Sequence, residues 1–151
     1  MSSQTSKATF AAGCFWGVQK HFDSIPGVLN TTVGYIGGHV DNPSYHQVCS
    51  GSTAHAEAIE IIFDPKSVSY ITLLNEFFLI HDPTMLNRQG PDIGSQYRSA
   101  IFTHSEEQQQ TALSIIASHP HHDRIVTQVV SASKFYPAEE YHQKYIEKKG
   151  L

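Results

Sequence analysis

The sequence is short of cysteine, of basic runs and of long hydrophobic runs, and each shortage excludes a class of protein. Two cysteines in 151 residues are too few for a disulfide scaffold, and they share no CxxC spacing for zinc or redox pairing. No apolar stretch approaches the ~18 residues of a membrane span. Lys and Arg number 10 against 14 Asp and Glu, so the net charge is −4. The sequence also has no run of Lys and Arg that could bind the phosphate backbone of a nucleic acid.

What remains has the size and composition of one folded domain. Hydrophobic residues make up 40% and charged residues 16%, a balance that excludes a disordered chain, and no repeat or linker divides the sequence. The first dozen residues carry one charge, Lys7, and no apolar segment of a secretory signal. We expect a single domain over 1–151 with flexible ends at 1–6 and 148–151, monomeric, cytoplasmic and without a membrane partner.

Hydrophobic periodicity predicts alternating strands and helices. We expect strands at 7–12, 28–35, 55–63, 97–103 and 124–130, helices at 14–23, 70–80, 105–118 and 138–147, and irregular loops at 39–52 and 87–94. A capping-box pattern, Ser105 with Gln108, marks the start of the third helix. This order predicts an α+β fold, one mixed β-sheet covered by helices, with a split βαβ, ferredoxin-like core.

Cys14 occupies the point where the first strand turns into the first helix, within Gly13-Cys14-Phe15-Trp16-Gly17. Free backbone N–H groups and the positive dipole end at a helix start favour a thiolate, so Cys14 is a candidate nucleophile. The neighbouring aromatic residues could wall a small apolar pocket. A cysteine beside aromatics can equally be an inert core residue, because free cysteine is among the most buried residue types.

Several further segments accompany this pentapeptide in a fixed order. They are Gly34-Tyr35-Ile36-Gly37-Gly38, Asn42-Pro43-Ser44-Tyr45, Val48-Cys49-Ser50-Gly51, His55-Ala56-Glu57, His81-Asp82-Pro83-Thr84, Asn87-Arg88-Gln89-Gly90, Asp92-Ile93-Gly94-Ser95-Gln96-Tyr97-Arg98-Ser99 and Glu140-Tyr141-His142-Gln143. Together they resemble peptide methionine sulfoxide reductases of the A type, from about Phe10 to Tyr145. One such segment would be weak evidence, but this many in register are highly specific.

The resemblance implies thiol-dependent reduction of methionine S-sulfoxide, free or in proteins. Reducing a sulfoxide requires a soft nucleophile at sulfur and an acid that protonates the departing oxygen. By resemblance, Cys14 is the nucleophile, which becomes a sulfenic acid, and Glu57 is the acid. Partial burial in an Ile- and Ala-rich strand would lift the pKa of Glu57 toward neutrality, whereas a strand-edge carboxylate facing water would play no part.

The same resemblance assigns the residues around the reacting atoms. Tyr45 and Tyr97 would donate phenolic hydrogen bonds to the sulfoxide oxygen, and Asp92 would help to position that polar network. Phe15 and Trp16 would form the pocket for the methyl group on sulfur and select the S epimer.

The sequence contains no cysteine after Cys49, although many family members carry recycling cysteines in a tail beyond the Tyr-His-Gln segment. We expect an external thiol, glutathione with glutaredoxin or a thioredoxin, to reduce the sulfenic acid. Two alternatives stay open: Cys49 resolves it, or a tail is missing from the sequence. We expect Cys49 to be structural.

No cofactor or metal site is expected. His119, His121, His122 and Asp123 are interrupted by Pro120, match no metal-ligand spacing and predict an exposed loop. His55, two residues before Glu57, is expected to be a packed histidine rather than a proton partner. Two competing functions are a non-catalytic thiol- or metal-binding module on the same fold and a peroxide-reducing thiol enzyme.

Overall fold

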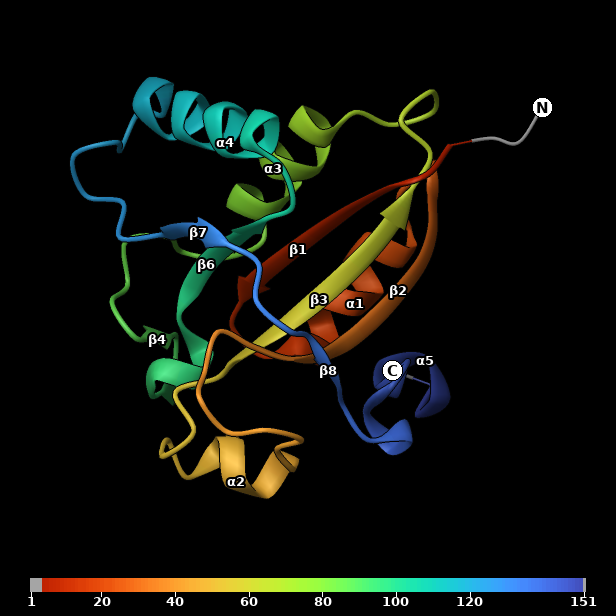
Figure 1. The fold of residues 1–151 in the computed structure, drawn as a ribbon, viewed down its shortest axis with the longest axis vertical. Helices are drawn as coiled ribbons and strands as arrows, with labels where there is room; N and C mark the ends of the chain where they lie inside the picture. Colours follow the sequence, from red (N-terminus) through yellow and green to blue (C-terminus); the bar gives the residue numbers. More distant parts are fainter. Residues whose placement is uncertain (1–3, 151) are drawn as a thin grey trace.

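A computed structural model describes residues 4–150 and places a twisted six-stranded sheet at the centre of the molecule (Figure 1). The strands are β1 (Ser6–Ala12), β2 (Val28–Ile36), β3 (Ala56–Phe63), β6 (Ser99–Thr103), β7 (Gln128–Ser131) and β8 (Tyr136–Pro137). The α-helices are α1 (Phe15–Asp23), α2 (Tyr45–Cys49), α3 (Tyr70–Leu79), α4 (Glu106–Ser118) and α5 (Tyr145–Lys148). Residues 1–3 and 151, within the ends that we expected to be flexible, lie outside the described part, and β1 already begins at Ser6.

The strand order is β7-β6-β1-β3-β2-β8. Within it, the succession β1-α1-β2-β3-α3-β6 builds four antiparallel neighbours in the order β6-β1-β3-β2, which is the split βαβ, ferredoxin-like arrangement. Strand β7 then joins β6 in parallel, so the sheet is mixed. The predicted fold class is therefore confirmed. No helix within residues 4–150 has the length and apolar character to cross a membrane.

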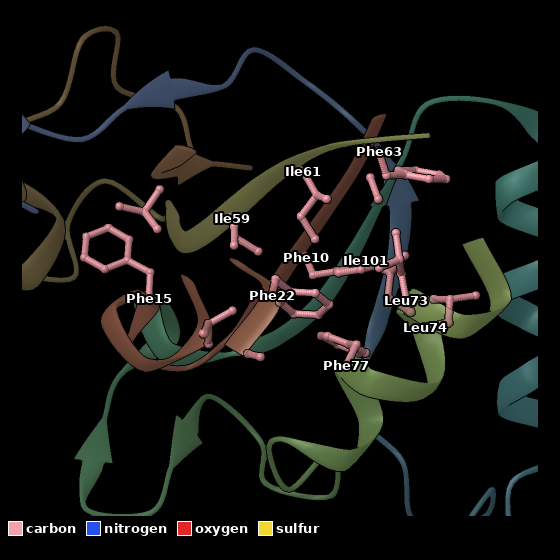
Figure 2. Packing of buried hydrophobic residues seen from close by; sticks show 14 of the residues in the cluster. Phe10, Phe15, Phe22, Ile59, Ile61, Phe63, Leu73, Leu74, Phe77 and Ile101 are labelled. Atoms are coloured by element: carbon pink, nitrogen blue, oxygen red, sulfur yellow. The ribbon is translucent and has the colours of Figure 1, made fainter. Parts of the chain in front are cut away.

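The hydrophobic core lies between the sheet and its helices (Figure 2). Alternate residues of β1 and β3, among them Phe10 and Ile59, point toward this layer and meet Phe22 of α1 and Phe77 of α3. The intervening residues of β1 and β3 join residues of β2 and β6 in a second cluster on the opposite face: Ala11, Ile36, Ala56, Ala58, Ala100 and Phe102. Successive residues of these strands point to opposite faces of the sheet, and both faces are buried. These strands therefore have few polar residues.

Residues 39–52, expected to be an irregular loop, contain α2. Its N-cap Ser44 accepts a hydrogen bond from the backbone N–H of Gln47, whose side chain accepts one from the N–H of Ser44. This reciprocal capping box stabilises a helix too short to show apolar periodicity. The other loop, 87–94, holds the small hairpin of β4 (Arg88–Gln89) and β5 (Asp92–Ile93).

The end of the chain also differs from the prediction. The last predicted strand, 124–130, is shorter in the structure, where β7 begins only at Gln128. Strand β8 was not predicted, because two residues are too few to show a hydrophobic pattern. The expected helix 138–147 divides into a 3-10 turn (Glu140–His142) and α5. Lys144 separates them with a φ of +57°, a left-handed conformation that a continuous α-helix excludes.

Candidate active site

Cys14 caps α1 directly after the turn that ends β1. Gly13 makes this turn with a φ of +92°, and a Cβ there would lie 2.9 Å from Cγ of Gln89. Glycine is therefore required at this position both by conformation and by space. The turn leaves the Cys14 thiol half-buried at the start of the helix.

Glu57 projects from β3 into the same region and is 1% exposed. Its Oε1 accepts a hydrogen bond of 3.3 Å from the backbone N–H of Phe15, whereas Oε2 is buried without a hydrogen-bond partner. Burial raises the pKa of Glu57 to about 7, against the lowering effect of the Phe15 hydrogen bond and with a further raising contribution from Asp92. The water-facing alternative for Glu57 is thereby excluded, and the carboxyl group can hold a proton near neutral pH.

The thiol of Cys14 differs from the sequence-based expectation. Its pKa is raised to about 11, mainly by burial and to a smaller extent by the nearby carboxyl groups of Glu57 and Asp92, against the lowering effect of a hydrogen bond with the backbone of Trp16. The helix start alone is therefore too weak to yield a stable thiolate, because desolvation and like charge oppose it. A protonated Glu57 removes the charge repulsion that it would otherwise exert on the thiolate.

Phe15, the residue after Cys14, packs against three other aromatic rings. It is 1% exposed, and its ring centroid lies 5.9 Å from Tyr35, 6.3 Å from Tyr45 and 5.4 Å from His142. These rings come from β2, α2 and the 3-10 turn near the end of the chain. The cluster therefore closes one side of the site with segments that are far apart in the sequence.

Trp16 stands beside this cluster and is held by two contacts that sequence reasoning missed. Its indole Nε1–H donates to Nδ1 of His142 at 3.0 Å, and its ring stacks on Tyr145 at 3.9 Å. Because indole is only a donor, Nδ1 of His142 accepts, and in the neutral ring the proton is on Nε2. Burial lowers the pKa of His142, and its Nε2 is buried without a partner. The Tyr-His-Gln segment was the only sequence signal for this region.

Tyr45, Tyr97 and Asp92 lie close enough to Glu57 to interact with it electrostatically. Burial raises the pKa of Tyr45, and a hydrogen bond with Cys49 and the charge of Glu57 raise it further. Burial and the charges of Glu57 and Asp92 likewise raise the pKa of Tyr97. The structure thus brings all the predicted site residues into one region, with the two phenols protonated and available as donors.

Cys49 lies at the end of α2 and joins the edge of this region. Its carbonyl accepts a hydrogen bond of 3.2 Å from Nε2 of Gln96, and its thiol interacts with the phenol of Tyr45. Both Cys14 and Cys49 are free thiols.

The remaining candidate histidines have other partners. Nδ1 of His55 accepts from the N–H of Gly38 at 2.9 Å and its Nε2 lies 2.7 Å from the carbonyl of Val40, so this ring braces the neighbouring loop. His121, His122 and Asp123 are exposed. Within residues 4–150, no group of three or more His, Cys, Asp or Glu side chains is arranged to hold a metal ion.

A thiol at a helix start, a buried carboxyl group with a pKa of about 7 and an adjacent cluster of aromatic rings are features of a thiol-dependent oxidoreductase, carried here on a ferredoxin-like α+β fold. Comparison with known proteins gives the family. The family model described as "Peptide methionine sulfoxide reductase" matches residues 6–150, and the chain belongs to this family. It is an oxidoreductase that reduces methionine S-sulfoxide to methionine, and the alternative of a non-catalytic binding module is not favoured.

Individual relatives agree with this assignment. The chain is 55% identical over 150 residues to a peptide methionine sulfoxide reductase of Methanothermobacter thermautotrophicus, covering 97% of this chain and 89% of the relative. It is 52% identical over 151 residues to one from Geobacter metallireducens, covering 97% and 93%. The reduced form of Mxr1 from Saccharomyces cerevisiae has a TM-score of 0.91 at 35% identity, covering 100% of this chain and 89% of that one. Methionine sulfoxide reductase A of Corynebacterium diphtheriae has a TM-score of 0.89 at 35% identity, covering 99% and 77%.

Proposed function

We propose that Cys14 and Glu57 carry out the chemical step of sulfoxide reduction together. The thiolate of Cys14 attacks the sulfur and forms an S–S bond while Glu57 protonates the oxygen. The resulting hydroxyl group is transferred to the sulfur of Cys14 as its bond to the substrate sulfur and the S–S bond break, which releases methionine and leaves a sulfenic acid on Cys14. The observation that carries this proposal is the buried Oε2 of Glu57, which has no partner and can hold a proton beside Cys14. The sulfur of methionine is reduced by two electrons and the sulfur of Cys14 is oxidised by two.

The surrounding groups have supporting parts in this proposal. Protonated Tyr45 and Tyr97 donate hydrogen bonds to the sulfoxide oxygen, and Asp92 orients that polar network. Phe15 and Trp16 receive the methyl group on sulfur, and the shape of their pocket selects the S epimer. The burial of Phe15 and the stacking of Trp16 on Tyr145 support this role because both rings are held rigidly in place.

We further propose that a thiol from outside the chain restores Cys14. The incoming thiol attacks the sulfenic sulfur, releases water and leaves a mixed disulfide, which a second thiol then reduces. Mxr1 of Saccharomyces cerevisiae, 26% identical with a TM-score of 0.66, has been crystallised in complex with Trx2, which supports a thioredoxin as the reductant. The interaction of Cys49 with Tyr45 supports a structural role for this second thiol. Glutathione, a monomeric state and a cytoplasmic location stay predictions.

A single-turnover experiment tests the proposal. Fully reduced protein is mixed with excess methionine S-sulfoxide without reductant, and methionine, sulfenic acid and disulfide are counted by trapping and mass spectrometry. We expect one methionine per chain, a trapped sulfenic acid on Cys14, a free Cys49, and no methionine from Cys14→Ser. Absence of methionine from the unmodified protein would overturn the role of Cys14. A Cys14–Cys49 disulfide would overturn regeneration by an outside thiol alone.

A further inference from the structure

The carboxylate of Glu139 joins three segments that are remote in the sequence. Glu139 precedes the 3-10 turn Glu140–His142, and its Oε1 accepts a 2.8 Å hydrogen bond from the hydroxyl of Tyr35 in β2. Its Oε2 accepts a 2.9 Å hydrogen bond from the backbone N–H of Tyr45, the first residue of α2. The partners are 104 and 94 residues away along the chain. The two carboxylate oxygens therefore accept hydrogen bonds from two different elements, β2 and α2.

The groups that Glu139 holds face the reacting centre. Tyr35 and Tyr45 both pack against Phe15, the residue after Cys14. The ring of Tyr45 also lies 4.2 Å from that of His142, which follows Glu139 by three residues. One carboxylate thus ties the start of α2 and the His142 segment to the same buried strand.

Glu139 is suited to this task because it stays ionised. Burial opposes its charge, but the hydrogen bonds from the backbone of Tyr45, from its own N–H and from Tyr35 outweigh that effect and lower the pKa of Glu139. A charged acceptor forms stronger and better directed hydrogen bonds than a neutral one. The adjacent Glu140 differs, since its side chain is 89% exposed and lies 3.5 Å from Lys148.

Helix α2 needs such an anchor. It has five residues, of which only Val48 is buried. The phenol of Tyr45 is carried on the first of these residues, so the direction of the side chain follows the backbone at the helix start. A shift of about 1 Å in a group that contacts the reacting atoms can lower a rate by on the order of 100-fold.

We propose that Glu139 is a positioning residue for sulfoxide reduction: by holding the N–H of Tyr45 and the hydroxyl of Tyr35, it fixes the Tyr45 phenol where the substrate oxygen binds. This inference rests on the proposed role of Tyr45 as a donor to that oxygen. Glu139 itself touches no reacting atom. Its effect on the rate is therefore transmitted through Tyr45.

A double-mutant cycle tests the inference. Methionine formation is measured in single turnover, without reductant, for Glu139→Gln, Tyr45→Phe and the double variant, at several sulfoxide concentrations. We expect Glu139→Gln to slow the saturated rate on the order of 10-fold, because the amide cannot accept both hydrogen bonds. In the Tyr45→Phe background the same change should slow the rate by less than about 2-fold, since the group being positioned is gone.

Matched variants separate positioning from loss of structure. Glu140→Gln, one residue further on, should leave the rate unchanged, and Tyr35→Phe should slow it in a way that is not additive with Glu139→Gln. Circular dichroism and thermal unfolding identify any variant that fails to fold, in which case the Tyr35→Phe and Tyr45→Phe pair is used instead. An unchanged rate in Glu139→Gln, or full additivity with Tyr45→Phe, would overturn the inference. A full rate in Tyr45→Phe alone would instead remove the proposed role of Tyr45.

Discussion

The backbone N–H of Phe15 donates to Oε1 of Glu57 at 3.3 Å, which fastens the carboxyl group to the first turn of α1. The same turn presents Cys14. The relative position of the Cys14 thiol and the Glu57 carboxyl group is therefore constrained by strand β3 and by the backbone of α1. Such fixed geometry lets a proton donor act without reorganisation during the reaction.

Replacing Glu57 by glutamine should remove the acid and keep the shape of the site. We expect the single-turnover rate of methionine formation to fall by about 10²–10⁴-fold, the usual contribution of a positioned acid. Alkylation of Cys14 by iodoacetamide should continue, and its rate serves as the control for an intact thiol. A normal rate of methionine formation would exclude Glu57 as the acid.

The pH profile should report how the two groups share one proton. The proposed reaction needs a thiolate at Cys14 and a proton on Glu57, whereas the pKa of Cys14 is about 11 and that of Glu57 is about 7. Below pH 7 both groups are protonated, so the rate should rise with pH; between 7 and 11 the pair holds one proton and the rate should level off. In Glu57→Gln the change of slope near pH 7 should disappear. Rapid-quench rates between pH 5 and 9 check both profiles, and a slope change that persists in the variant would contradict the assignment.

Stability should also depend on the proton of Glu57. Its pKa is raised from 4.5 to about 7 in the folded protein, so the folded state binds this proton more tightly than the unfolded chain. The resulting stability is fully present below pH 4.5 and is lost as the pH rises through 7, by on the order of 3 kcal/mol. Denaturant unfolding at several pH values should show a smaller loss over this interval in Glu57→Gln. Equal losses in both proteins would contradict the expected linkage.

The two glycines that flank Cys14 should respond in opposite ways to alanine. Gly13 has a φ of +92° and no room for a Cβ beside Gln89, so Gly13→Ala should destabilise the fold by more than about 1 kcal/mol. Gly17 is exposed in α1, and a Cβ added there would meet nothing within 4 Å, so Gly17→Ala should stabilise by up to about 1 kcal/mol. Urea midpoints of both variants check this contrast, and destabilisation by Gly17→Ala would refute it.

Trp16 should contribute mainly to substrate binding. Trp16→Ala removes the ring that stacks on Tyr145, and loss of an apolar wall of this kind is expected to raise KM by about 10–200-fold. Trp16→Phe keeps a ring but loses the hydrogen bond to His142, so its effect on KM should be smaller. Steady-state kinetics with a small sulfoxide substrate distinguish these cases. A lower kcat at unchanged KM would place Trp16 in the chemical step instead.

Local pattern was sufficient for the long elements of the fold. Apolar alternation predicted β3 and β6 to within a few residues, and β-branched content and a closing glycine did the same for β2 and β1. Each of these strands lies in the sheet with regularly spaced core contacts. Local pattern failed for α2, β4, β5 and β8, whose lengths of two to five residues leave no period to recognise. The helix expected at 138–147 was broken at Lys144, where its left-handed backbone is accompanied by hydrogen bonds to Gln19 and Asp23.

The sequence by itself determined the class of fold, the strand–turn–helix around Cys14 and the resemblance to a family, because these depend on neighbours along the chain. Only the tertiary structure decided the chemistry of the site. Sheet order buries Glu57 beside Cys14, and burial raises the pKa of Glu57 toward neutrality as expected. Burial also raises the pKa of Cys14, against the expectation from the helix start alone. The bridge from Glu139 to Tyr35 and Tyr45 likewise joins residues about 100 positions apart. Desolvation and long-range hydrogen bonds depend on what surrounds a group, which no local pattern contains.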